Sequence, residues 1–126
     1  MHKFSFVLLH VESPTASAAF YADLLGKKPV ETSPSFAMLP LGDEVMLGLW
    51  SRRTVEPVAS APGGGEVAFT AVYAADVERT HADWKKRGLP IAQKPTAMDF
   101  GHTFVALDPD GHRLRVFAPA AAPESA

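Results

Sequence analysis

The chain has 126 residues, 47% of them apolar and 21% charged, with a formal net charge of −2 and no cysteine. This composition predicts one globular domain with a buried core, and it excludes disulfides, thiolate catalysis, cysteine-ligated zinc and a nucleic-acid footprint. Because it has neither a signal-peptide pattern nor an apolar run of the roughly 20 residues that span a bilayer, we expect a cytoplasmic protein with no membrane partner.

The first half of the chain predicts a strand, a helix and three further strands. Residues 4–11 form an apolar run typical of a buried strand. Ser13 and Pro14 are residue types that favour the start of a helix. The helix is expected to run to Leu25 and to end at Gly26. Its predicted buried stripe is Ala16, Phe20 and Leu24, with Tyr21 and Leu25 beside it. The three strands that follow are predicted at residues 29–32, 36–41 and 44–51.

The second half repeats this order after a polar connection at residues 52–65. A strand at 66–72 precedes a helix at 77–87. Asp76 is its predicted N-cap, and Gly88 ends it. The residues that this helix is expected to bury are Val77, Thr80 or His81, and Trp84. The predicted strands that complete the repeat are 89–93 and the two arms of a hairpin over 103–117, which turns at 108–111.

Alternation along the predicted strands gives each sheet an apolar face and a mixed face. The last strand is expected to turn Leu114 and Val116 toward a helix, and Arg113, Arg115 and Phe117 toward a cavity. Arg113 lies nearer the turn and is expected to be solvated, and His81 and His112 are expected at the surface. The cavity face of the strand 44–51 carries Met46, Gly48 and Trp50. A glycine in mid-strand costs stability, so we expect another group to approach Gly48 closely.

The two halves form an internal repeat, with an offset of roughly 62 residues between their helices. The predicted fold class is α+β: two βαβββ repeats that form a cupped eight-stranded mixed sheet with two main helices. We expect one domain over residues 1–118, made of modules at about 1–58 and 64–118, and a flexible tail at 119–126. The mixed faces of the two modules are expected to line a shared cleft.

Two segments resemble landmarks of the vicinal oxygen chelate superfamily. Residues 11–26 are similar to its first helix, and residues 108–111, Asp-Pro-Asp-Gly, are similar to the turn before its last strand. This superfamily holds glyoxalase I, extradiol dioxygenases, fosfomycin resistance enzymes and bleomycin-binding proteins. The resemblance covers the whole chain and implies the glyoxalase/bleomycin resistance fold. Because the family includes both enzymes and binding proteins, the fold alone does not assign a function.

The enzymes of this family bind a metal ion through four residues, on the first, fourth, fifth and eighth strands. The resemblance places these positions at Phe6, Gly48, Glu66 and Arg115. Only Glu66 has a ligand atom for a divalent cation, and Arg115 would repel one. The resemblance therefore implies a protein without a metal or other cofactor. Glu66 and Arg115 are expected to form an ion pair, or else to meet an amine or hydroxyl and a carboxylate of a ligand.

Residues 43–51, 99–104 and 108–116 resemble the metal-free, dimeric members of the family that sequester a phenazine antibiotic. The resemblance implies a homodimer with clefts at or near the subunit interface. It also implies a small aromatic ligand, such as a phenazine- or bleomycin-type antibiotic. Trp50 has a flat surface for such a ligand, although it equally suits a core or an interface. The predicted ligand-binding residues are Phe6, Leu8, His10, Phe36, Met46, Gly48, Trp50, Glu66, Phe100, His102, Arg115 and Phe117.

Several residues admit a second interpretation. His10 on the cavity face would donate a hydrogen bond to a ligand, act as a general base, or serve the structure alone. A metal site made of His10, His102 and Glu66 is a further alternative. It would suit an enzyme of this family, a glyoxalase-like lyase or a dioxygenase with displaced ligands. Asp108 and Asp110 form a carboxylate pair, which the hairpin turn explains.

Overall fold

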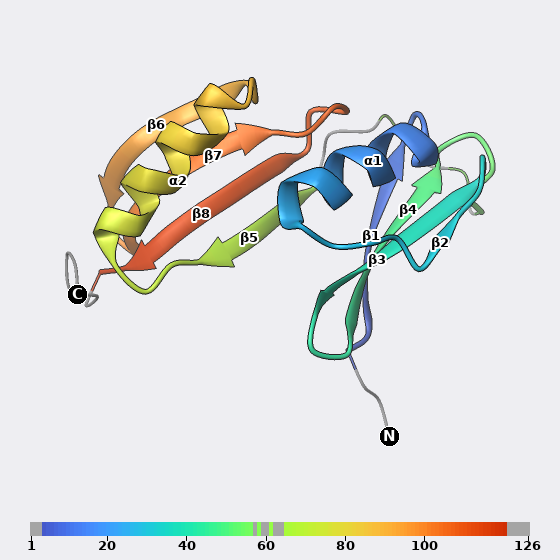
Figure 1. The fold of residues 1–126 in the computed structure, drawn as a ribbon, viewed down its shortest axis with the longest axis horizontal. Coiled ribbons are helices and arrows are strands. Elements are labelled where there is room, and N and C mark those ends of the chain that lie inside the picture. Colours follow the sequence, from blue (N-terminus) through green and yellow to red (C-terminus); the bar gives the residue numbers. More distant parts are fainter. Residues whose placement is uncertain (1–3, 57, 59–60, 62–64, 121–126) are drawn as a thin grey trace. The chain divides into compact units, whose positions relative to one another are not determined.

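The computed structural model describes residues 4–56, 58, 61 and 65–120, which form two compact units, Met1–Pro62 and Gly63–Ala126 (Figure 1). The first unit holds β1 (Phe6–Val11), α1 (Pro14–Leu25), β2 (Glu31–Thr32), β3 (Phe36–Gly42) and β4 (Val45–Ser51). The second unit holds β5 (Glu66–Thr70), α2 (Ala74–Lys86), β6 (Ile91–Met98), β7 (Gly101–Leu107) and β8 (Arg113–Pro119). Each unit therefore has the predicted order of one strand, one helix and three strands, and the predicted fold class is confirmed with its strands in two four-stranded mixed sheets.

The first unit is a four-stranded sheet with α1 packed against it (Figure 1). The strand order is β1-β4-β3-β2, in which β1 is parallel to β4 and the other neighbours are antiparallel. The helix starts as predicted, because the Ser13 hydroxyl accepts a hydrogen bond from the backbone N–H of Ala16 at 3.1 Å. It ends at Gly26, whose φ of 65° is a left-handed conformation that glycine adopts without strain.

The core of the first unit lies between α1 and the sheet. The strand residues that are almost fully buried are Leu9, Val11, Ala37, Leu39, Leu47 and Leu49. The predicted helix stripe is wrong in part: Ala16 is exposed, and Phe20 and Leu24 are only half-buried. The helix buries Pro14, Ser17, Ala18 and Tyr21, the last of which was predicted beside the stripe. Because Ser17 and Ala18 are small, α1 can approach the sheet closely while the Tyr21 ring enters the core. Close packing therefore decided the orientation of this helix more than hydrophobicity did.

The second unit has the strand order β5-β8-β7-β6, with β5 parallel to β8 and α2 packed against the sheet (Figure 1). Trp84 on α2 is buried and makes edge contacts with Phe69 and Phe104, at 6.2 and 5.5 Å between ring centroids. Val77 is also buried, as predicted. His81 is half-buried, with its ring 5.3 Å from that of Phe104. It therefore fits the prediction that placed it on the buried stripe better than the surface position.

The start of α2 differs from the prediction. The helix begins at Ala74, and its N-cap is Tyr73 in an extended conformation, without a side-chain cap hydrogen bond. Asp76 therefore lies in the first turn and not at the cap, and its carboxylate pairs with Arg79. A negative charge in the first turn of a helix interacts favourably with the helix dipole. This interaction explains an aspartate in the first turn as well as capping explains one at the N-cap.

The last hairpin is longer than predicted at both of its ends. β7 begins at Gly101, where φ is 148° and a Cβ would overlap the carbonyl oxygen of Ala118 on β8. Only glycine allows the two strands to approach so closely at this point. β8 continues to Pro119, the first residue of the predicted tail. The tail residues 121–126 lie outside the described residues. Neither helix in the described part of the chain is long and apolar enough to cross a membrane.

Candidate ligand-binding site

The strand registers of the two units are equivalent around the positions predicted from the family's metal ligands. In the first unit, Gly48 pairs with the residue two positions after Phe6. In the second unit, Arg115 pairs with the residue two positions after Glu66. Phe6 and Glu66 therefore occupy matching places in the repeat, as do Gly48 and Arg115. Each matched pair lies on a parallel strand pair, β1 with β4 and β5 with β8.

The first unit has an apolar pocket on the sheet face opposite α1. Its volume is about 460 Å³, and the described residues that line it are Phe6, Leu8, Glu31, Phe36 and Trp50. The rings of Phe36 and Trp50 meet edge to face, with centroids 6.1 Å apart. Phe6 and Leu8 are 41% and 46% exposed. Four residues of the predicted ligand-binding set thus come together at one open pocket.

Glu31 is a pocket residue that the sequence prediction missed. It lies on the two-residue strand β2, where it pairs with Met38 of β3, and Met38 in turn pairs with Gly48 of β4. The predicted strand at 29–32 contained Glu31, but neither its partner strand nor its register was predicted. Alternation places a strand residue on a face only when the register is known, so Glu31 could not be assigned to this pocket.

Gly48 lies at the base of the same face and is closely approached, as predicted. A Cβ built on Gly48 would overlap the Leu8 Cδ2 and would lie 3.2 Å from the Phe36 ring. The space where a longer residue would emerge is therefore filled by hydrocarbon. Met46 pairs with Phe6, and His10 pairs with Trp50. Both are half-buried, but neither lines the pocket.

The second unit carries a polar cluster around Arg115 on the face opposite α2. The Arg115 Nε lies 3.3 Å from Glu66 Oε1, so the predicted ion pair is present. The Arg115 Nη1 donates to Thr103 Oγ1 at 3.2 Å and to Gln93 Oε1 at 3.5 Å. The guanidinium carbon also lies 5.6 Å from the centroid of the Phe100 ring. With a side chain only 17% exposed, Arg115 is held from several directions.

Two aromatic residues complete this cluster as predicted. Phe100, which is 45% exposed, meets the half-buried Phe117 edge to face, with 5.9 Å between the ring centroids. Gln93 and Thr103 were not predicted as site residues, although both lie within the predicted strands at 89–93 and 103–117, because their place beside Arg115 depends on the strand register. The cross-strand pairing of Thr103 with Phe117 places both near Arg115.

His102 does not join this cluster. Its Nε2 lies 3.0 Å from Glu78 Oε1 on α2, so its side chain is on the helix side of the sheet. It lines a different pocket, of about 530 Å³, beside the first residues of α2. Thr103, the next residue along β7, points toward Arg115, as strand alternation requires. His102 and Glu66 consequently face opposite sides of the second sheet, which argues against the metal site predicted as an alternative.

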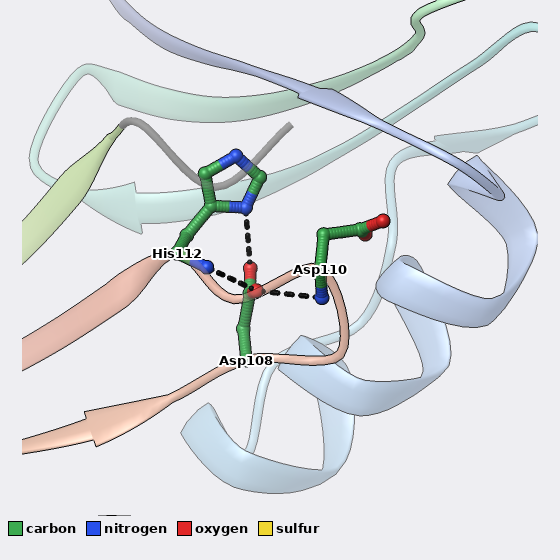
Figure 2. Close-up of side chains that lie close together, drawn as sticks. All are labelled: Asp108, Asp110 and His112. Atoms are coloured by element: carbon green, nitrogen blue, oxygen red, sulfur yellow. Dashed lines mark hydrogen bonds and ion pairs between the residues drawn. The ribbon is translucent and has the colours of Figure 1, made fainter. Parts of the chain in front are cut away.

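The hairpin turn holds a buried carboxylate and imidazole, and Figure 2 shows Asp108 and His112 pointing toward each other. Asp108 Oδ1 accepts from the backbone N–H groups of Asp110 and His112, at 2.9 and 2.8 Å. Asp108 Oδ2 lies 2.9 Å from His112 Nδ1. His112 is 2% exposed, so the surface position predicted for it is wrong. Ligand atoms of Asp108, Asp110 and His112 lie within 4.8 Å of one another, but the hydrogen bonds account for the cluster as a turn structure.

The fold agrees with what comparison with known proteins shows. A model of the Glyoxalase/Bleomycin resistance protein/Dioxygenase superfamily matches residues 3–116. The chain belongs to this superfamily. Phenazine antibiotic resistance protein EhpR of Enterobacter agglomerans is 30% identical to it over 112 residues, or 86% of each chain. The predicted resemblance to a phenazine resistance protein is therefore confirmed.

Two solved structures show the same fold. Protein ATC0852 of Agrobacterium tumefaciens, known from solution NMR, is 51% identical, with a TM-score of 0.87 over 96% of this chain and 100% of that chain. A glyoxalase/bleomycin resistance protein/dioxygenase from Nocardioides is 22% identical, with a TM-score of 0.80 over 100% of this chain and 89% of that chain. The second similarity is one of fold alone.

Proposed function

We propose that this protein binds a planar aromatic compound, such as a phenazine- or bleomycin-type antibiotic, without a metal ion and without changing it. Capture of this kind would give resistance by sequestration. The relationship to a phenazine antibiotic resistance protein supports the ligand class. We further propose that the protein acts in the cytoplasm as a homodimer.

The observation that carries the proposal is the chemistry at the four positions predicted from the family's metal ligands. Arg115 is a cation, and its guanidinium already holds the carboxylate of Glu66 at 3.3 Å. Phe6 has no donor atom, and Gly48 has no side chain beneath the Leu8 methyl. A divalent cation needs several oxygen or nitrogen ligands, so these residues do not fit one.

The pocket of the first unit supports an aromatic ligand. Its volume of about 460 Å³ is within the range of small-molecule sites. Three of the described residues that line it, Phe6, Phe36 and Trp50, have rings on which a planar molecule can stack or pack edge to face. The exposed Phe6 and Leu8 side chains lose contact with water when a ligand covers them, which favours binding.

The first test combines metal analysis with binding of phenazine. Dialysed protein should contain no stoichiometric divalent metal by elemental analysis, and it should bind phenazine by isothermal titration calorimetry. The compound should be recovered unchanged by mass spectrometry after incubation. Retained stoichiometric metal, absence of binding, or conversion of the compound would each overturn the proposal, and conversion would favour the enzyme alternative.

The second test removes the proposed stacking surface. Trp50→Ala should weaken phenazine binding by about three- to tenfold, the loss expected for one aromatic pair. Phe4→Ala is a matched control, because Phe4 is a 70% exposed aromatic residue in the same unit that does not line the pocket. Equal affinities for the parent protein and Trp50→Ala would show that the ligand does not stack on Trp50.

A further inference from the structure

Glu31 places a carboxylate in the otherwise apolar pocket of the first unit. The other described residues that line this pocket are Phe6, Leu8, Phe36 and Trp50, so Glu31 is the ionisable member of the described lining. Its carboxylate has no ion pair or side-chain hydrogen bond among the described residues. Among the described residues, this charge therefore holds no other protein group in place.

Three aromatic rings and one carboxylate are complementary to a positive charge. The face of an aromatic ring attracts a cation, and tryptophan is the most effective of the aromatic residues. The carboxylate of Glu31 adds a direct charge–charge attraction, which is strengthened where a ligand displaces water from the pocket. The same carboxylate would repel an anionic ligand and would contribute little to the binding of a neutral one.

Three arginines near the two candidate clusters are paired with carboxylates. Arg52 and Arg53, which follow β4 shortly after Trp50, both pair with Glu12. In the second unit, Arg115 is paired with Glu66. Within the described part of the chain, no positive residue lines the pocket of the first unit, so the charge of Glu31 is not offset by its described lining.

We propose that this pocket selects planar aromatic compounds that carry a positive charge, and that Glu31 determines this selectivity. The inference rests on the proposed function, since it names the ligand class of the same site. The chemistry that it predicts is a flat ring system bearing a quaternary or protonated nitrogen. The rings of Phe36 and Trp50 would contact the aromatic plane, and Glu31 would lie close to the charge.

The test uses three compounds with one ring system and different charges: N-methylphenazinium, phenazine and phenazine-1-carboxylate. Affinities are measured by isothermal titration calorimetry at low and at high salt. The parent protein should bind the cation about fivefold or more tightly than the neutral compound, the factor expected for one nearby opposite charge, and the anion most weakly. High salt should reduce the difference.

Glu31→Gln should bring the affinity for the cation to within about twofold of that for phenazine, chiefly because binding of the cation weakens. Glu56→Gln removes one negative charge from the same unit without touching the described lining of the pocket, and should retain the cation preference. Because Glu31 is exposed on an edge strand, the variant is expected to fold, and circular dichroism verifies this.

The outcomes separate the two proposals. If all three compounds bind with equal affinity, or if the anion binds best, the charge preference is wrong and the proposed function stands. A cation preference that persists in Glu31→Gln would overturn the role of Glu31. If none of the three compounds binds to the parent protein, both the proposed function and the charge preference fail.

Discussion

Replacement of Arg115 by alanine tests the centre of the polar cluster in the second unit. The variant loses the contact with Glu66 at 3.3 Å, the hydrogen bonds to Thr103 and Gln93 at 3.2 and 3.5 Å, and the position over the Phe100 ring. The Glu66 side chain is 38% exposed, so solvent reduces the ion pair to about 0–1 kcal/mol. The hydrogen bonds and the cation–π contact add about 1–2 kcal/mol, and release of side-chain entropy offsets about 1 kcal/mol. We expect a net loss of up to about 2 kcal/mol in the free energy of unfolding.

Urea denaturation of Arg115→Ala, Glu66→Gln and the double variant measures this loss and its origin. The coupling energy between the two residues should be about 0.3–1 kcal/mol and should shrink in about 1 M salt. Arg113→Ala is the matched control, since Arg113 is an exposed arginine on the same strand and should cost less than about 0.5 kcal/mol. Equal losses for Arg115→Ala and Arg113→Ala, with no coupling to Glu66, would refute the reasoning and show that Arg115 is solvated.

Three further substitutions test local features of the fold. Gly101→Ala should destabilise the protein by about 2–4 kcal/mol in urea denaturation, because its φ of 148° disfavours alanine and the new methyl group overlaps the Ala118 carbonyl. Asp108→Ala should lower the free energy of unfolding by about 2–4 kcal/mol, because two backbone N–H groups and one imidazole lose their acceptor. A much smaller loss would show that the turn forms without these hydrogen bonds. A hydrogen bond from Arg52 lowers the pKa of Glu12, so its contribution to stability is present above the usual pKa and is lost as the pH falls through the lowered one. Glu12→Gln should therefore weaken the acid-side decline of stability, and an unchanged pH profile would contradict this.

Local patterns predicted the elements of each unit well. Ser13 and Gly26 mark the ends of α1 because capping depends only on residues adjacent in the chain. Strand alternation placed Leu114 and Val116 in the core and Arg115 on the opposite face, because a two-residue period follows from strand geometry alone. The predicted pairing of Arg115 with Glu66 depended on the resemblance to the family's metal-ligand positions, which fall on the parallel strands β5 and β8.

The errors arose where long-range packing decides the outcome. His112 seemed a surface residue because it follows a turn, but the carboxylate of Asp108 satisfies its ring nitrogen and permits burial. His102 was predicted outside the hairpin strands, at the rim of the cavity, whereas β7 begins at Gly101 and alternation turns the His102 side chain toward α2. Glu31 was missed because its place depends on the register of a two-residue strand. Sequence periodicity does not contain this register, and tertiary contacts supply it.

Gly48 lies at a position predicted from the family's metal ligands and is closely approached by Leu8 of the pocket, and Gly48→Ala tests its role in the pocket. The new methyl group would overlap the end of the Leu8 side chain, which is 46% exposed and can rotate outward. Relief of glycine's entropy cost offsets the crowding, so stability should change by less than about 1 kcal/mol. The displaced Leu8 would occupy pocket volume, and phenazine affinity should fall several-fold by titration calorimetry. Gly42→Ala is the control, because a Cβ on Gly42 meets nothing within 4 Å. If Gly48→Ala instead unfolds the protein, or leaves affinity unchanged, the glycine serves the strand and not the ligand.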